Sequence, residues 1–107
     1  MTNKIETSLL LDYYGAMLTA RQQEILRLYC DMDMSLSEIA DEFEITRQAA
    51  LDLITRGTDK LKMYEDKLGL VKKVKNIRFV LQSMIDTTSD ESIKIKLNGL
   101  LSDIKEL

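Results

Sequence analysis

Residues 35–61 read SLSEIADEFEITRQAALDLITRGTDKL, and they contain two helix starts close together. Ser35 followed by Glu38 matches a capping box, in which each side chain bonds the other residue's backbone N–H in the first turn of a helix. A short helix over residues 36–43 follows, and Thr46 can cap a second helix a few residues later. The stretch therefore predicts a helix-turn-helix.

The second helix of this motif is predicted to run from Arg47 to about Lys67, where Gly69 offers a C-cap. Its apolar residues recur at helical spacing, which places one face in a core. Gly57 lies inside this helix, and Gly in a helix interior costs about 1 kcal/mol relative to Ala. We therefore expect a close packing contact or a kink at Gly57.

Arg47 and Gln48 occupy the first turn of the second helix. In DNA-binding motifs of this shape, that turn faces the major groove while the first helix crosses the backbone. Arg can bond guanine bidentately and Gln can bond adenine, and the hydroxyl of Thr46 with nearby backbone amides can hold a phosphate. These three residues form the centre of a predicted DNA-binding surface.

Four further side chains extend this surface along the second helix. Asp52 could accept a hydrogen bond from cytosine, whereas the basic side chains that follow suit phosphates better than base edges. The predicted DNA-binding residues are Thr46, Arg47, Gln48, Asp52, Arg56, Lys60 and Lys62. A solvent-exposed side chain without a ligand is the alternative interpretation of each.

A helix is also predicted at the start of the chain, over residues 4–17. Four of its apolar residues share a face at 3.6-residue spacing, namely Ile5, Leu9, Tyr13 and Met17, and this stripe is widened by Leu10, Leu11 and Tyr14. We predict that this stripe packs into the core. A contact with another protein through Tyr13 and Tyr14 is the alternative, since Tyr is enriched at protein interfaces.

Thr19 and Gln22 match a second capping box and predict that another helix begins there. This helix is predicted to end near Asp31, because the run Asp-Met-Asp-Met continues a helix poorly and Ser35 opens the next one.

The last third of the chain has the spacing of two paired helices. Apolar residues recur at alternating intervals of four and three in two runs, which are Leu70, Val74, Ile77, Leu81 and Met84, then Ile93, Leu97, Leu100, Ile104 and Leu107. A polar break over residues 86–89 separates the runs, and Thr88 with Glu91 matches a capping box. We predict an antiparallel hairpin that packs on the rest of the domain or on another subunit.

Length and composition agree with this helical interpretation. The chain has 107 residues, with no Pro and only four Gly, two Phe and four Tyr. Such a composition favours helices over sheets and turns. We predict an all-α protein with a single domain over residues 1–107, made of a three- to four-helix core carrying the helix-turn-helix over residues 18–67 and a helical hairpin over residues 70–107.

Charge is unevenly distributed, although the net charge is only −3. Residues 1–46 hold three basic and nine acidic side chains, residues 47–79 hold nine and four, and residues 80–107 hold three and five. A basic stretch inside an acidic chain can attract phosphates locally while the whole molecule resists indiscriminate binding. Solvated helix faces with uneven charge are the alternative interpretation.

The residues that are missing argue against an enzyme. The chain has no His, and its one cysteine, Cys30, is interpreted as a small buried hydrophobic residue. Carboxylate pairs such as Asp41 with Glu42 have no associated nucleophile, metal-ligand set or phosphate loop. We therefore expect no catalytic residue, no metal site, no cofactor and no small-molecule substrate.

No apolar run approaches the roughly 20 residues that crossing a bilayer requires, and residues 1–8 are polar where a signal peptide would turn apolar. We expect a cytoplasmic protein without a membrane contact.

Several runs of this sequence resemble known families. Leu18 begins LTARQQE, Leu36 begins LSEIADE and Ile45 begins ITRQAA, and together they resemble the promoter-reading region four of bacterial sigma factors over residues 18–64. With LLDYYG from Leu10 and YEDKLGL from Tyr64, nearly the whole chain resembles the YlxM family of small bacterial helix-turn-helix proteins, which is the closer match.

The resemblance implies a regulator that is linked, through gene neighbourhood, with the signal recognition particle and its receptor. Two features depart from simple promoter reading. Leu51 stands where sigma-like helices often present a polar or basic residue, and Asp52 and Asp59 bring negative charge near a surface meant for phosphates. The first helix of the motif adds further acidic residues, which are Glu38, Asp41, Glu42 and Glu44.

Two functions are therefore weighed. The first is sequence-specific binding of double-stranded DNA by a homodimer whose subunits meet through the terminal hairpin. The alternative is an adaptor that contacts protein or RNA of the signal recognition particle, for which Leu51 and the acidic faces are the motivation.

Overall fold

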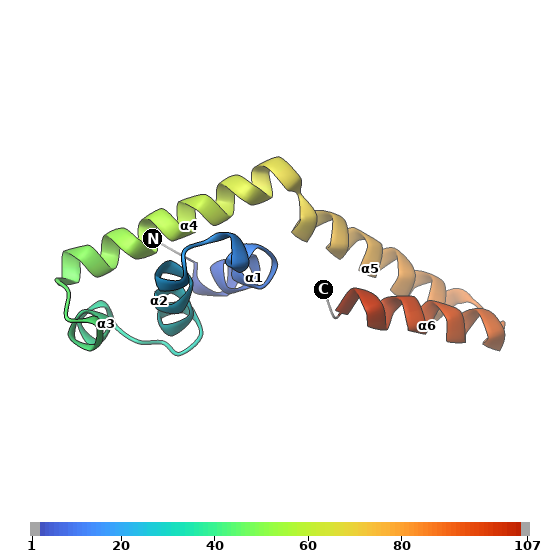
Figure 1. Ribbon diagram of the computed structural model, residues 1–107. Coiled ribbons are helices and arrows are strands. Elements are labelled where there is room, and N and C mark those ends of the chain that lie inside the picture. Colours follow the sequence, from blue (N-terminus) through green and yellow to red (C-terminus); the bar gives the residue numbers. More distant parts are fainter. Residues whose placement is uncertain (1–2, 106–107) are drawn as a thin grey trace. The chain divides into compact units, whose positions relative to one another are not determined.

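The computed structural model describes residues 3–105, and within them it consists of helices and connecting turns without a strand (Figure 1). The helices are α1 (Lys4–Tyr14), α2 (Ala20–Cys30), α3 (Leu36–Phe43), α4 (Arg47–Leu68), α5 (Leu70–Thr87) and α6 (Glu91–Lys105), and a 3₁₀ turn, η1 (Gly15–Met17), follows α1. The prediction of an all-α helix-turn-helix fold is confirmed. None of the helices within residues 3–105 combines the length and apolar character needed to cross a membrane.

The chain divides into two compact units, with the boundary between Leu68 and Gly69. Gly69 has φ 62°, in the left-handed region that glycine occupies without the steric cost of a Cβ. A glycine is therefore suited to the single residue that separates the end of α4 from the start of α5.

Both predicted capping boxes in the first unit are present. The Thr19 hydroxyl accepts a hydrogen bond from the Gln22 backbone N–H at 3.1 Å, and the Gln22 side chain accepts one from the Thr19 N–H at 3.4 Å. The corresponding bonds between Ser35 and Glu38 are both 3.0 Å. These bonds fix where α2 and α3 begin, because they satisfy N–H groups that have no partner inside a helix.

The predicted cap of α6 is wrong by two residues. Asp90, not Thr88, caps this helix, since its carboxylate accepts hydrogen bonds from the backbone N–H groups of Ser92 (2.9 Å) and Ile93 (3.3 Å). The Thr88 hydroxyl accepts from the N–H of Asp90 at 3.3 Å and so shapes the turn instead. A carboxylate directly before a helix also benefits from the helix dipole, which a hydroxyl does not.

The predicted apolar stripe of α1 is buried only in part. Ile5 is 86% exposed and Met17 is 51% exposed, whereas Leu10, Leu11 and Tyr14 are buried. The α-helix ends at Tyr14 and the chain continues as a 3₁₀ turn, so the 3.6-residue spacing that joined Met17 to the stripe does not hold there. Tyr14 therefore belongs to the core and not to an interface.

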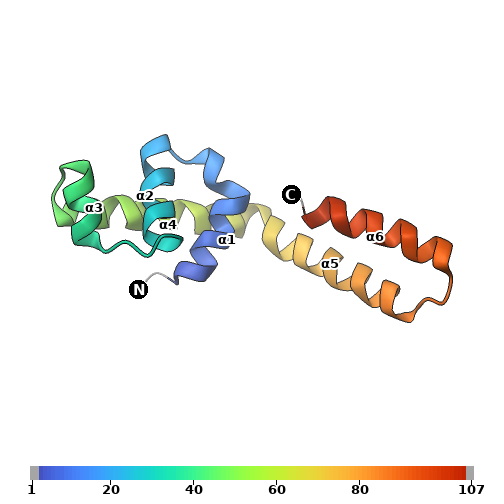
Figure 2. The ribbon, with the colours of Figure 1, turned by 90° about the horizontal axis from the view of Figure 1, so that it is seen from below.

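The core of the first unit lies where α1, α2 and α3 pack on α4 (Figures 1 and 2). Its largest fully buried side chains include Leu11, Tyr14, Ile25, Leu26, Ile39, Ile54 and Leu61. The Tyr14 hydroxyl donates to the Glu65 carboxylate at 2.6 Å, which links the end of α1 to the last turns of α4.

Gly57 marks a close approach of α4 to α2. A Cβ placed on Gly57 would lie 2.7 Å from Cδ1 of Leu26, which is fully buried. The helix runs without interruption through this residue. Of the two predicted explanations for this glycine, close packing is therefore correct, and a side chain of any size would have to displace Leu26.

The second unit is the predicted helical hairpin, in which α5 and α6 run antiparallel (Figure 2). Its small core consists of Leu81, Leu97 and Leu101, with Ile85 and Ile104 packed against them. The final residue of the predicted seam, Leu107, lies outside the described residues.

Candidate nucleic-acid interface

The turn between α3 and α4 is short and has one unusual residue. Glu44 follows the last residue of α3 with φ 54° and ψ 43°, a left-handed conformation. The next residue, Ile45, donates its backbone N–H to the Ala40 carbonyl at 3.0 Å and is half-buried. The left-handed residue reverses the chain so that α4 can start three residues later, at Arg47, with its first turn directed away from α3.

Thr46 caps α4 as predicted. Its hydroxyl accepts a hydrogen bond from the Ala49 N–H, and its carbonyl accepts one from the Ala50 N–H, both at 3.0 Å. The N–H groups of Arg47 and Gln48 belong to the first turn, where a helix offers no internal acceptor. They therefore point out of the helix end with a partial positive charge, which suits a phosphate.

The predicted DNA-binding residues are all exposed in the structure; they are Thr46, Arg47, Gln48, Asp52, Arg56, Lys60 and Lys62. Gln48 and Asp52 are joined by a hydrogen bond of 3.1 Å from the Gln48 Nε2 to the Asp52 Oδ1. This bond uses one N–H of the amide, so the other N–H and the carbonyl oxygen remain available. Those are the two groups that a bidentate bond to adenine requires.

The six side chains on α4 itself do not all share one face. Residues at four-residue intervals follow one line along a helix, and Gln48, Asp52 and Arg56 form such a line opposite the buried residue Ile54. Lys60 continues this line. Lys62 is rotated by about 200° from Lys60 and so lies on the other flank of α4.

The first helix of the motif presents an acidic surface. Glu38, Asp41, Glu42 and Glu44 are all exposed. The pKa of Glu38 is lowered because its carboxylate accepts hydrogen bonds from the backbone and side chain of Ser35. These acidic side chains oppose any phosphate that approaches from this side of the motif.

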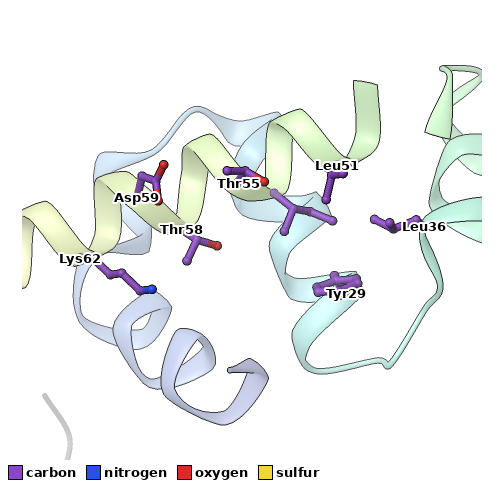
Figure 3. A pocket seen from close by; sticks show the side chains of 8 residues that line it. Tyr29, Leu36, Leu51, Thr55, Thr58, Asp59 and Lys62 are labelled. Atoms are coloured by element: carbon purple, nitrogen blue, oxygen red, sulfur yellow. The ribbon is translucent and has the colours of Figure 1, made fainter. Parts of the chain in front are cut away.

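The other flank of α4 holds a feature that the sequence interpretation missed, a hollow of about 340 Å³ bounded by α2, α3 and α4 (Figure 3). Of its lining residues only Lys62 was singled out as a site residue. The signal in the sequence is the helical spacing of Leu51, Thr55, Thr58 and Lys62, which mixes apolar and polar side chains on one line of α4.

Comparisons with known proteins agree with the helix-turn-helix. The profile of the UPF0122 family, described as "Putative helix-turn-helix protein, YlxM / p13 like", matches residues 1–100. A UPF0122 protein of Clostridium perfringens is 40% identical over 109 residues, which is 97% of this chain and 97% of the relative. One of Bacillus pumilus is 39% identical over 92% of this chain and 89% of the relative, and one of Desulforamulus reducens is 52% identical over 62% and 56%.

Proposed function

The chain belongs to the UPF0122 family of YlxM/p13-like helix-turn-helix proteins, and on that premise we propose that it is a regulatory protein that binds double-stranded DNA. In this proposal the first turn of α4 enters the major groove, and α3 crosses the DNA backbone. Arg47 forms hydrogen bonds with guanine, and Gln48 forms hydrogen bonds with adenine.

One observation carries this proposal: two polar side chains at the start of α4 face solvent, and one of them is already oriented. Arg47 and Gln48 are exposed, and Asp52 holds the Gln48 amide through the 3.1 Å bond. A fixed amide loses less conformational entropy on binding than a free one, which favours sequence reading.

Phosphate contacts are assigned to the groups around this turn. The Thr46 hydroxyl and the N–H groups of the first turn would hold one phosphate at the helix end. Arg56 and Lys60, farther along the same line, would hold the adjacent backbone. Their charges also oppose the repulsion expected from the acidic side chains of α3.

Fluorescence anisotropy with genomic duplex fragments at several salt concentrations tests this assignment. Arg47→Ala is expected to reduce sequence preference, at a cost of about 1–3 kcal/mol for the preferred site. Lys60→Ala is expected to weaken all duplexes alike and to reduce the salt slope by about one. Lys96→Ala in α6, an exposed lysine of the second unit, is the matched control and should leave binding unchanged.

Failure of the unaltered chain to bind any duplex at low salt would contradict the proposal, because phosphate contacts strengthen as salt falls. If Arg47→Ala weakened every duplex as evenly as Lys60→Ala, the assignment of Arg47 to base recognition would be contradicted, whereas DNA binding itself would not.

We further propose that the protein binds DNA as a homodimer through its hairpin. Four apolar side chains of the second unit are 44–52% exposed, Ile77 and Met84 on α5 and Ile93 and Leu100 on α6. Each pair is seven residues apart, and Met84 and Leu100 each follow a core leucine by three residues. Because α5 and α6 run antiparallel, a side chain three residues after a core leucine points to the same side of the hairpin on either helix. The four exposed side chains therefore form one continuous apolar face.

An adaptor that contacts protein or RNA of the signal recognition particle is the second candidate. Two observations favour it, the 38% exposure of Leu51 on the motif's second helix and the acidic surface of α3. Pull-down from lysate with and without nuclease separates the candidates. A partner that survives nuclease treatment supports protein docking, and loss of all partners supports nucleic acid.

A further inference from the structure

The hollow beside α4 has an apolar end and a polar end (Figure 3). Tyr29 of α2, Leu36 of α3 and Leu51 of α4 surround the apolar end. Lys4 packs over the Tyr29 ring, with its Nζ 4.4 Å from the ring centroid, and holds that ring in place. A volume of about 340 Å³ lies within the range of small-molecule sites.

The Thr58 hydroxyl is the first indication of a binding site. The residue is only 3% exposed, and its hydroxyl oxygen has no hydrogen-bond partner. Buried hydroxyls are nearly always bonded, because leaving one without a partner costs the desolvation of a polar group. Figure 3 shows this oxygen directed into the hollow.

Lys62 supplies the second sign, one helical turn farther along α4. Its side chain extends toward Thr58 in Figure 3, and it has no ion pair within the part of the chain that the structure describes. An ammonium group and a hydroxyl thus both line a hollow whose other end is apolar. Both can donate hydrogen bonds to the same acceptor.

We propose that this hollow binds a small organic carboxylate with an apolar body. The carboxylate accepts hydrogen bonds from the Thr58 hydroxyl and the Lys62 ammonium, and the body packs on Tyr29, Leu36 and Leu51. Asp59 also lines the hollow and opposes the anion. The molecule would be a ligand and not a substrate, since none of these side chains is a nucleophile or a base paired with one.

Such a ligand would touch both helices of the helix-turn-helix at once. Leu36 lies at the start of α3, and Leu51 lies one turn after Arg47 on α4. Filling the space between them would favour one arrangement of the two helices, which is how a small molecule can alter DNA binding. This regulatory consequence rests on the proposed function, whereas the binding of the carboxylate does not.

Titration of the ¹⁵N-labelled full chain with phenylbutyrate, followed by NMR without DNA, tests the site. Saturable shifts are expected at the backbone amides of Leu51, Thr55, Thr58 and Lys62. Phenylbutanol keeps the apolar body without the charge, and acetate keeps the charge without the body. Each is expected to bind at least about tenfold more weakly than phenylbutyrate, since each lacks one of the two interactions.

Single substitutions identify the groups that bind the carboxylate. Thr58→Val keeps the shape of the side chain without its hydroxyl, and Lys62→Gln replaces the ammonium group with a shorter, neutral amide. Each should weaken phenylbutyrate binding about tenfold. Asp59→Asn should tighten binding, since it removes a repulsive charge. Lys67→Gln is the matched control, since Lys67 is an exposed lysine on the opposite flank of α4, and it should leave phenylbutyrate binding unchanged.

Three results would overturn the proposal. One is equal binding of phenylbutanol and phenylbutyrate. Another is that the NMR shifts caused by phenylbutyrate occur at backbone amides outside the hollow. The third is unchanged affinity in a Thr58→Val chain whose spectrum shows it to be folded.

Discussion

At the scale of single residues, Gly57 decides how closely α4 can approach α2. Gly57→Ala would gain about 1 kcal/mol of helix propensity but would place a methyl group 2.7 Å from the buried Leu26 Cδ1. Overpacking of a core costs about 1–3 kcal/mol. We therefore predict that Gly57→Ala lowers the free energy of unfolding by about 1 kcal/mol, measured by urea denaturation.

Gly99 in α6 is the control for this prediction, because a Cβ there would meet no atom within 4 Å. Gly99→Ala should raise stability by up to about 1 kcal/mol through helix propensity alone. Stabilisation by both substitutions would show that the Leu26 side chain moves aside and that close packing does not require Gly57.

Glu44 is the second residue with a measurable consequence. Its φ of 54° is left-handed, and a residue with a Cβ pays about 1–2 kcal/mol in that region. Glycine pays no such cost, although it loses more backbone entropy on folding. Glu44→Gly is therefore predicted to raise the free energy of unfolding by about 0.5–1 kcal/mol, and a decrease in the melting temperature would contradict this account of the turn.

At the scale of helices, the sequence predicts the starts of α2, α3 and α4 correctly because each start is a local event. The hydroxyls of Thr19, Ser35 and Thr46 each bond a backbone N–H three residues ahead. Such a bond depends on nothing outside the first turn, so the residue types suffice to predict it.

The same scale shows where prediction from the sequence stops. Ile5 and Leu10 are both apolar residues of α1, and only the packing of α1 on α2 and α4 distinguishes the buried Leu10 from the exposed Ile5. The hollow beside α4 is likewise made by side chains from three helices. The spacing of residues within one helix cannot predict that the buried Thr58 hydroxyl has no hydrogen-bond partner, because this depends on how the helices pack together.

The hairpin permits a test of the proposed dimer at this scale. Met84→Lys combined with Leu100→Glu places charges on the apolar face without touching the core leucines Leu81 and Leu97. We predict that the double variant keeps its helical circular dichroism and is monomeric by light scattering, whereas the unaltered chain is dimeric.

Ile95→Lys is the control for the dimer test. Ile95 is 70% exposed but lies away from the face of Ile93 and Leu100 on α6, so its charge should leave the oligomeric state unchanged. A monomeric unaltered chain would contradict the proposed interface.

At the scale of the whole molecule, the charge distribution limits how the protein can meet DNA. The chain carries a net charge of −3, so its affinity for phosphates depends on the basic residues 47–79. The acidic side chains of α3, the helix that is proposed to cross the DNA backbone, oppose this contact. Binding should therefore depend on the basic side chains of α4 and weaken steeply as the salt concentration rises.

The most direct test of the proposed function is an NMR titration of the ¹⁵N-labelled full chain with a mixed-sequence duplex of about two helical turns at low salt. The proposal predicts that the largest shifts occur at Thr46, Arg47 and Gln48, and that Arg47→Ala diminishes them. Shifts confined to the hairpin or to the acidic face of α3, or none at all, would contradict the claim that the first turn of α4 enters the groove.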